Sequence, residues 1–426
     1  MKRRQFLHCA GAGLLAVSAT GCAAIAAPGR NAPHVIVIGG GYGGATAARY
    51  LRMWSGQGIA VTVIEPNPAF ISCPLSNLVL GGSATLADLT LTYERLVRGH
   101  GVRVLRDSAT AIDTARRTVT LAGGAVLGYD RLVLSPGIEL LSGALPGMER
   151  ADAQQQVLHA WKAGPQTAAL RAQLAAMPDG GVFALTIPPA PYRCPPGPYE
   201  RACQVAHYFS AFKPRAKVLI LDANDDVVSK GALFKRIWRE RYGGIVEYRP
   251  SFRTAAVDAG ARTAISELGD RVQASVLNVI PPQRAGAIAV QTGLANVNGN
   301  WCGVDFLTFE STAAPYVHVL GDAIQTSPLM PKSAHMANQH AKVCAAAIVE
   351  LLAGRAPAPD PVLTNTCYSF VSARDVIHVA SVHAYDAARK TLLVVPGSGG
   401  VSQDASAIEG EYAWNWARNI WADTLG

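Results

Sequence analysis

A glycine-rich turn between two short apolar runs constrains the fold of this chain more than any other feature. The runs 35–38 and 61–64 are typical of buried strands, and 43–54 between them is predicted to be a helix. The turn has the pattern Gly-x-Gly-x-x-Gly, which allows a close backbone approach to a pyrophosphate at a helix N-terminus. An acid 21 positions after the last glycine is placed to bind ribose hydroxyls. The unit therefore predicts a dinucleotide site formed by Gly39, Gly41, Gly44 and Glu65.

Two further strand-to-turn segments indicate that the dinucleotide is FAD. The turn at Pro136 and Gly137 lies where flavoproteins with two dinucleotide folds return to the flavin domain. Gly321 and Asp322 lie where such proteins place an aspartate on the ribityl chain. A helix beginning near Lys332 would point its positive end, and the lysine itself, at the negative edge of a reduced flavin. A solvated lysine is the alternative at that position.

A second βαβ unit is predicted over residues 182–186, 199–212 and 218–222, but its first turn lacks the glycines. The segment 188–191 carries three prolines there instead. Proline has no N–H to offer a phosphate, and its ring blocks a close backbone approach. The sequence therefore argues against NAD(P)H binding at this second unit.

These units predict an α/β protein of the glutathione-reductase-like type, with two Rossmann-like dinucleotide-binding domains and a C-terminal α+β domain. A length of 426 residues is sufficient for two or three domains. Strands are predicted over 368–371, 376–379 and 391–395, before a tail with three tryptophans that pack or line an interface. The predicted divisions are a signal peptide over 1–26, an FAD-binding domain over 34–145 and 287–356, a degenerate NAD-binding-like domain over 146–286, and a flavin-covering domain over 357–426.

The N-terminus has the features of a twin-arginine export signal. Arg3 and Arg4 precede an apolar run from 9 to 19, and small residues suited to cleavage follow at 24–26. The sequence therefore predicts a periplasmic protein, with lipidation at Cys22 as a less favoured alternative. The formal net charge is +8, and Lys2 contributes to it together with the two arginines of the leader. The remaining charge is too small and dispersed to favour nucleic acid, and no stretch has the length and apolarity of a membrane span.

Cysteine spacing excludes a metal or haem site within this chain. Six of the eight cysteines lie outside the leader, and no pair has zinc-ligand spacing. No Cys-x-x-Cys-His occurs, so any c-type haem belongs to a partner. Cys203 and Cys344 fall in apolar helical patterns, and together with Cys302 they are predicted to be core residues.

Four segments of the chain resemble the flavoprotein subunit of flavocytochrome c sulfide dehydrogenase. The likeness extends from about His34 to the C-terminus, and the segments are 159–166, 191–200, 365–369 and 412–423. The Tyr-Arg-Cys-Pro-Pro strip at 192–196 is also similar to sulfide:quinone oxidoreductases. The tryptophan-rich tail and the leader favour the flavocytochrome branch.

The resemblance implies roles for four residues. Cys194 and Cys367 would form a redox-active disulfide that a hydrosulfide anion opens, leaving a persulfide and a thiolate that passes two electrons to the flavin. Glu200 would take up a proton near the flavin. Cys73 would bind the 8α-methyl carbon of FAD covalently. From the residues alone, a structural disulfide, a helix-N-terminal glutamate and buried thiols are the alternatives.

The sequence thus predicts a sulfide dehydrogenase subunit that forms a heterodimer with a c-type cytochrome and passes electrons to it, with haem c only in the partner. One rival is a sulfide:quinone oxidoreductase, although the short tail offers no long amphipathic anchor. A pyridine nucleotide-disulfide reductase is the second rival. A component that binds or regulates a thiosulfate-oxidising assembly without turnover is the third.

Overall fold

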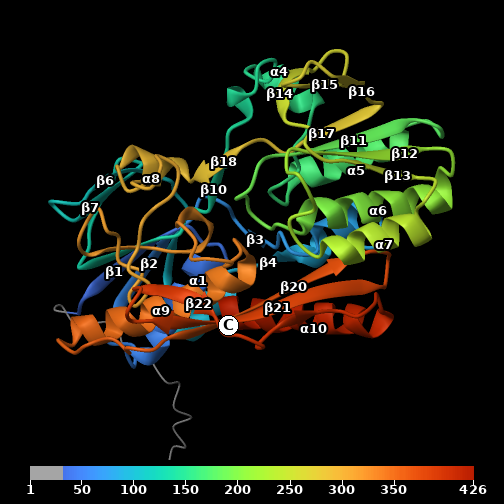
Figure 1. The fold of residues 1–426 in the computed structure, drawn as a ribbon. Coiled ribbons are helices and arrows are strands. Elements are labelled where there is room, and N and C mark those ends of the chain that lie inside the picture. The colour runs from blue at the N-terminus through green and yellow to red at the C-terminus, as the bar shows by residue number, and fades with distance from the viewer. Residues whose placement is uncertain (1–31) are drawn as a thin grey trace, which may run out of the picture.

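The computed structural model describes residues 32–426, and its centre is a parallel five-stranded sheet in the order β19-β9-β1-β2-β5. Valines and isoleucines of its central strands are fully buried, as a sheet covered on both faces requires. Helices α1 (Tyr42–Trp54) and α9 (Ala334–Leu352) pack against each other beside this sheet (Figure 1). The strands are β1 (His34–Ile38), β2 (Ala60–Ile64), β5 (Arg103–Leu105), β9 (Arg131–Leu134) and β19 (Val317–Val319).

A second parallel sheet has the order β13-β12-β11-β17. Helix α6 (Gly197–Phe212) packs on it, and the register places Ile187 opposite Asp222 at the carboxyl ends of the central strands. The other elements are β11 (Val182–Ile187), β12 (Lys217–Asp222), β13 (Val246–Arg249), β17 (Val276–Val279), α5 (Pro165–Ala176) and α7 (Gly231–Arg241).

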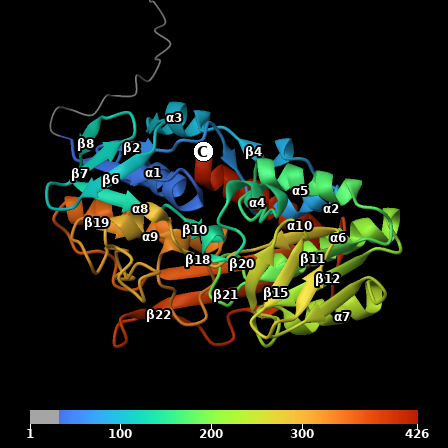
Figure 2. The same ribbon diagram turned by 90° about the horizontal axis from the view of Figure 1, so that it is seen from above.

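The antiparallel pair β10 (Ile138–Leu140) and β18 (Gln283–Ala285) lies between the two parallel sheets in both views (Figures 1 and 2). Strand β10 carries the chain from the first parallel sheet to the second, and β18 carries it back. The loops that leave both sheets therefore face a common space. The smaller elements are β3 (Phe70–Ile71), α2 (Ser76–Gly81), β4 (Thr90–Leu91), α3 (Glu94–His100), β6 (Ala109–Asp113), β7 (Thr118–Leu121), β8 (Val126–Gly128), α4 (Ala151–Gln156), β14 (Thr254–Asp258), β15 (Thr263–Ser266), β16 (Arg271–Gln273) and α8 (Ala287–Gln291).

The C-terminal region combines an antiparallel sheet with a long helix. Strand β21 (Val376–Asp386) pairs with β20 (Val362–Phe370), β22 (Thr391–Val394) and β23 (Gly400–Val401). The predicted strands 368–371 and 376–379 were shorter than β20 and β21, whereas 391–395 agrees with β22 to within one residue. The tryptophan-rich tail is helix α10 (Ala407–Leu425), which the sequence analysis missed. Its small buried residues recur at helical spacing against α1 and β21. The α/β class with two Rossmann-like domains is confirmed, with an α+β C-terminal region.

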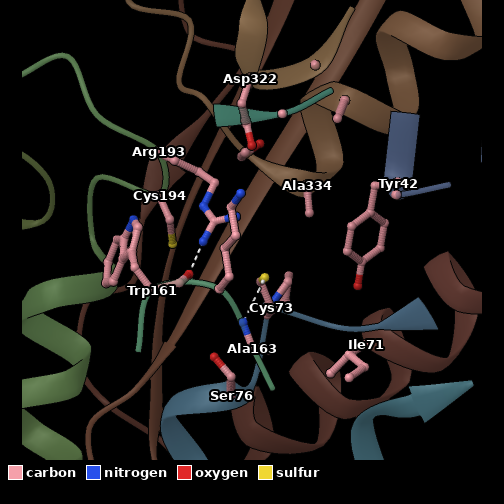
Figure 3. Close-up of a pocket in the computed structure, with 18 of the residues that line it drawn as sticks. Tyr42, Ile71, Cys73, Ser76, Trp161, Ala163, Arg193, Cys194, Asp322 and Ala334 are labelled. Carbon is pink, nitrogen blue, oxygen red and sulfur yellow. Dashed lines mark hydrogen bonds between the residues drawn. The ribbon is translucent and has the colours of Figure 1, made fainter. Parts of the chain in front are cut away.

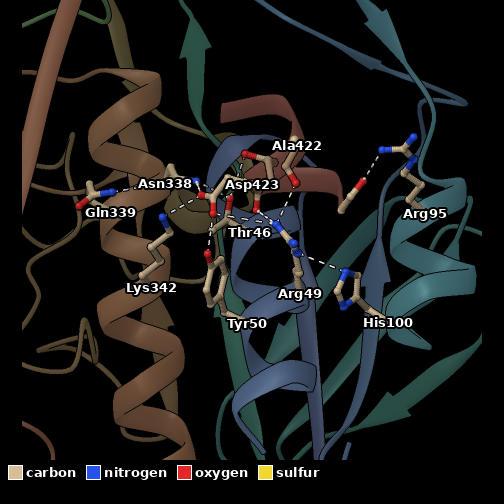
Figure 4. A network of polar contacts seen from close by, with 12 residues as sticks. Thr46, Arg49, Tyr50, Arg95, His100, Asn338, Gln339, Lys342, Ala422 and Asp423 are labelled. Atoms are coloured by element: carbon tan, nitrogen blue, oxygen red, sulfur yellow. Dashed lines mark hydrogen bonds and ion pairs between the residues drawn. The ribbon is translucent and has the colours of Figure 1, made fainter. Parts of the chain in front are cut away.

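A polar network attaches α10 to α1 and α9. Asp423 accepts hydrogen bonds from the Tyr50 hydroxyl at 2.5 Å and from Asn338 Nδ2 at 2.7 Å (Figure 4). Lys342 Nζ lies 2.8 Å from the same carboxylate, and Arg49 donates to two carbonyls near the end of α10. The network holds the last described helix against the helix that follows the glycine fingerprint.

Candidate active site

One cavity of about 490 Å³ lies where the two Rossmann-like units and the C-terminal sheet meet. It is lined by residues of the glycine fingerprint, the loops that leave both parallel sheets, strand β20 and helix α10. Eleven of the thirteen predicted site residues line this cavity, and only Gly44 and Lys332 do not. The eleven are Gly39, Gly41, Glu65, Cys73, Pro136, Gly137, Cys194, Glu200, Gly321, Asp322 and Cys367.

The fingerprint glycines serve different purposes in the structure. A Cβ on Gly44 would lie 1.8 Å from the Gly39 carbonyl oxygen, so this glycine allows α1 to pack closely against the turn. Gly39 has φ +96°, and a Cβ there would lie 2.3 Å from the Ser135 carbonyl oxygen. A Cβ on Gly41 would meet no protein atom within 4 Å. Gly41 therefore leaves backbone open to the cavity, as a phosphate-binding turn requires.

The acidic residues of the cavity fit the ribose and ribityl parts of FAD. Glu65 is held by the Gly40 N–H at 2.8 Å and by the Asn67 N–H at 2.8 Å, at the carboxyl end of β2. Asp322 follows Gly321, whose φ is +74°. Its Oδ1 is buried and has no hydrogen-bond partner among the described residues. A buried carboxylate oxygen without a donor is costly, and a ribityl hydroxyl would supply that donor.

Lys332 does not point into the cavity, contrary to the sequence-based expectation. Its Nζ donates to the carbonyls of Asp322 and Ile324 at 2.9 and 2.5 Å, and lies 3.6 Å from the Trp301 ring centroid. These acceptors lie close by in sequence, in the turn that contains Asp322, and they draw the ammonium away. The start of α9 still faces the cavity through Ser333, so the helix dipole keeps its predicted direction while the lysine charge does not.

The two predicted redox cysteines line the same cavity although they belong to different domains. Cys194 lies in the loop before α6 with φ +57°, and its N–H donates to the Lys332 carbonyl at 2.8 Å. Cys367 lies within β20, beside Asn365. All six described cysteines are free thiols in the structure. Burial raises the pKa of Cys194 to about 12, and proximity to Cys367 adds to this shift.

Glu200 is a buried carboxylate next to this pair. Its two oxygens accept hydrogen bonds from the Phe370 N–H at 2.9 Å and from Asn77 Nδ2 at 3.0 Å. Burial raises its pKa above the ordinary value despite these donors. A carboxyl with a raised pKa is suited to accept a proton and to return it.

Cys73 lies between β3 and α2 at the edge of the cavity, where the Ala163 N–H approaches its sulfur at 3.5 Å. Arg193, which the sequence analysis did not select, reaches into the cavity between Cys73 and Cys194 (Figure 3). A second missed residue is Lys230, whose ammonium is buried and donates to the Cys367 carbonyl at 2.9 Å. Arg193 belongs to the Tyr-Arg-Cys-Pro-Pro strip and adjoins Cys194 in sequence, whereas Lys230 belongs to no recognisable motif and only the fold brings it to Cys367.

The carboxyl end of the second parallel sheet is closed by protein side chains. Asp222, at the position of a ribose-binding acid, is fully buried and accepts from the hydroxyls of Tyr199 and Tyr248 at 2.7 and 3.1 Å. Asn224 connects this group to the proline segment by donating to the Pro188 carbonyl at 3.1 Å. Because Asp222 already accepts hydrogen bonds from protein hydroxyls and the proline segment occupies the turn, this sheet offers no ribose or phosphate site of the fingerprint type.

Residues 32–426 contain neither a metal cluster nor a membrane-spanning helix. No cluster of three or more histidine, cysteine, aspartate or glutamate side chains is arranged to hold a metal ion. No helix in this part of the chain has the length and apolarity needed to cross a membrane. Cys203, Cys302 and Cys344 are fully buried, as predicted.

Three family models match the chain. The central domain of the sulfide dehydrogenase (flavocytochrome c) flavoprotein chain matches residues 167–281. The flavin-binding domain of flavocytochrome c sulphide dehydrogenase matches 359–425, and pyridine nucleotide-disulphide oxidoreductase matches 33–175. The matched ranges include Cys194, Cys367 and Cys73.

Comparisons with individual proteins agree with the family models. The chain is 53% identical over 46 residues to the sulfide dehydrogenase (flavocytochrome c) flavoprotein chain of Chlorobaculum thiosulfatiphilum, covering 11% of this chain and 94% of that sequence. It is 24% identical over 305 residues to the mitochondrial sulfide:quinone oxidoreductase of Mus musculus, covering 69% of this chain and 66% of that one. Alignments to sulfide:quinone oxidoreductases cover from 26% to 66% of those proteins, less than two thirds of their length. The structure of the Aquifex aeolicus sulfide:quinone oxidoreductase superposes with TM-score 0.71 at 18% identity over 92% of each chain, which shows a shared fold.

Proposed function

We propose that this chain, which is related to flavocytochrome c sulfide dehydrogenases and to sulfide:quinone oxidoreductases, oxidises sulfide at a cysteine pair beside FAD and passes the electrons to a c-type cytochrome subunit. The observation that carries the proposal is the meeting of Cys194 and Cys367 in one cavity with the unpaired Asp322 oxygen. Thiol chemistry and a dinucleotide site thus share one space.

The residues that would hold FAD follow from the cavity. Gly41 would contact the pyrophosphate, Glu65 a ribose, and Asp322 the ribityl chain, while Cys73 would form the covalent bond. FAD, when bound, takes up an electron pair and releases electrons singly. A thioether at Cys73 would prevent loss of the flavin after export. Export itself is supported by the twin-arginine pair Arg3 and Arg4.

In the proposed reaction the chain begins with a disulfide between Cys194 and Cys367. A hydrosulfide anion attacks one sulfur, the disulfide bond breaks, and its electron pair leaves on the other sulfur as a thiolate. The attacked cysteine then carries a persulfide, so the sulfide sulfur has been oxidised and the disulfide reduced. Glu200 holds the proton that hydrogen sulfide or the persulfide gives up.

The cytochrome acceptor is supported by the two flavocytochrome-type models over the central and C-terminal regions. The closed end of the second sheet, at Asp222, argues against a nicotinamide nucleotide as donor or acceptor. Quinone is the competing acceptor, because sulfide:quinone oxidoreductases share the fold.

The test is anaerobic mixing of the purified flavoprotein with sulfide, followed by addition of cytochrome c or of a soluble quinone analogue. We expect sulfide to bleach the flavin, NADH to leave it oxidised, and cytochrome c to be reduced much faster than the quinone. Faster quinone reduction would place the chain among the quinone enzymes. Tight binding to a cytochrome or sulfur-oxidising partner without sulfide consumption would contradict an enzymatic role.

A further inference from the structure

Lys230 is a buried cation without a carboxylate in contact. It precedes α7, and its Nζ donates to the Cys367 carbonyl at 2.9 Å, Ser369 Oγ at 2.8 Å and the Ile377 carbonyl at 3.3 Å. These contacts use all three donors of the ammonium on neutral acceptors. No ion pair of Lys230 occurs among residues 32–426. A buried charge of this kind needs a counter-charge nearby or loses its proton.

The negative groups that face Lys230 come from four elements. Burial lowers its pKa to about 8, and Cys367, Glu200, Cys194 and Glu409 oppose that shift. Both Glu200 oxygens already accept from neutral donors, and the Glu409 carboxylate lies 2.9 Å from His378 Nδ1. The sulfurs are therefore the groups near Lys230 whose charge changes when a disulfide opens.

Two arginines also act on this cluster, but they face Cys194. Burial raises the pKa of both thiols. Among the positive charges that oppose this rise, Arg193 leads at Cys194, with Lys230 after it, and Lys230 leads at Cys367. Arg201 is engaged by Asn77, Asn278 and two backbone carbonyls. Lys230 is thus the cation placed for the sulfur of Cys367.

We propose that Lys230 is a positioning residue that holds strand β20 at Cys367 and supplies the counter-charge for the anionic sulfur formed there. The inference rests on the proposed function, since it concerns the same cysteine pair. Attack of HS⁻ on the disulfide forms one S–S bond and breaks another, and the total charge of −1 remains in the cluster as thiolate.

The test measures thiol reactivity rather than turnover. The holoenzyme is reduced with dithiothreitol and treated with iodoacetamide over a range of pH, and alkylation of the Cys367 peptide is followed by mass spectrometry. Alkylation rates follow the thiolate fraction. A nearby positive charge lowers the pKa of a thiol, and Lys230 is the leading such charge at Cys367, so Lys230→Met should slow alkylation of Cys367 about tenfold at pH values below the thiol pKa. The alkylation rates of Lys230→Met and the wild type should converge at high pH, and Lys230→Arg should restore most of the lost rate.

Lys213→Met is the matched control, because Lys213 is equally buried, donates to backbone carbonyls of Ala175 and Met177, and lies outside the cavity. Its alkylation profile should match the wild type. An unchanged alkylation profile in Lys230→Met would overturn the counter-charge role. A decrease in the alkylation rate that is equal at all pH values would do the same. If Lys230→Met does not fold, Lys230→Gln is measured with the same criteria. Absence of sulfide oxidation in the wild type would refute the proposed function without altering the alkylation result.

Discussion

Replacement of Glu200 by glutamine separates its proton-accepting role from its structural one. The carboxylate accepts from the Phe370 N–H and from Asn77 Nδ2. Asn77 cannot turn its amide to suit a glutamine, because its Oδ1 accepts from Arg201 Nε at 3.1 Å. Glu200→Gln therefore keeps one hydrogen bond and sets its amide donor against another donor, while Asn77 Nδ2 retains the Gly197 carbonyl as an acceptor at 3.1 Å. The unmet donor should cost about 1–3 kcal/mol of the free energy of unfolding.

The pH dependence of this cost has a definite sign. Burial raises the pKa of Glu200, so the folded state binds its proton more tightly than the unfolded chain does. This carboxyl therefore reduces stability as the pH rises from its unfolded pKa toward its folded pKa. Glutamine does not titrate, so the difference in the free energy of unfolding between the wild type and Glu200→Gln should shrink over the same pH range. Thermal unfolding at several pH values measures it.

The catalytic effect should be larger. Loss of a general base costs about 10²–10⁴-fold in the step it assists, and sulfide-dependent flavin reduction in a stopped-flow instrument reports that step. The wild-type rate should rise with pH as Glu200 ionises, and this rise should be absent in Glu200→Gln. Glu310→Gln, which removes a carboxylate that is paired with Arg131 and does not line the cavity, is the control. A variant with the wild-type rate and pH profile would refute the reasoning.

Three further predictions concern the cysteines and the C-terminal helix. Cys194→Ser and Cys367→Ser should each abolish sulfide-dependent flavin reduction while dithionite still reduces the flavin; undiminished sulfide consumption in either variant would contradict the disulfide mechanism. Cys73→Ser should release FAD on acid denaturation, whereas the wild type should keep a mass increase of one flavin by mass spectrometry; release from both would exclude the covalent bond. Asp423→Asn should lose about 2 kcal/mol through its weakened bonds to Tyr50 and Lys342, measured by urea unfolding. Hydrogen bonds from these partners lower the pKa of Asp423, so the loss should be full above its unfolded pKa and vanish as the pH falls through the folded pKa; a loss independent of pH would argue against the ion pair.

The parts of the site that the sequence predicted are those fixed by short-range chemistry. The fingerprint glycines act within one turn, and the spacing to Glu65 is set by one helix and one strand. The pairing of Cys194 with Cys367 came from family resemblance, because no local rule joins residues of different domains. Lys332 was placed wrongly because nearby carbonyls, rather than the helix direction, determine where its ammonium lies.

Other features depend on contacts that the sequence does not display. Helix α10 was missed because the first half of its buried face consists of Gly410, Ala413 and Ala417, so the apolar period is weak there. Lys230 follows no motif, and its importance depends on the approach of β20 to the start of α7. Tertiary packing, which brings β20 to α7, supplied what local patterns could not.

The position of Trp416 has a consequence for the order of assembly. This residue of α10 lines the same cavity as Gly41, so the wall of the cofactor chamber joins segments at opposite ends of the described chain. During translation the fingerprint leaves the ribosome long before α10 is made. The cavity is therefore complete only after α10 has been synthesised. A flavin that binds earlier would enter a cavity that lacks the wall formed by α10.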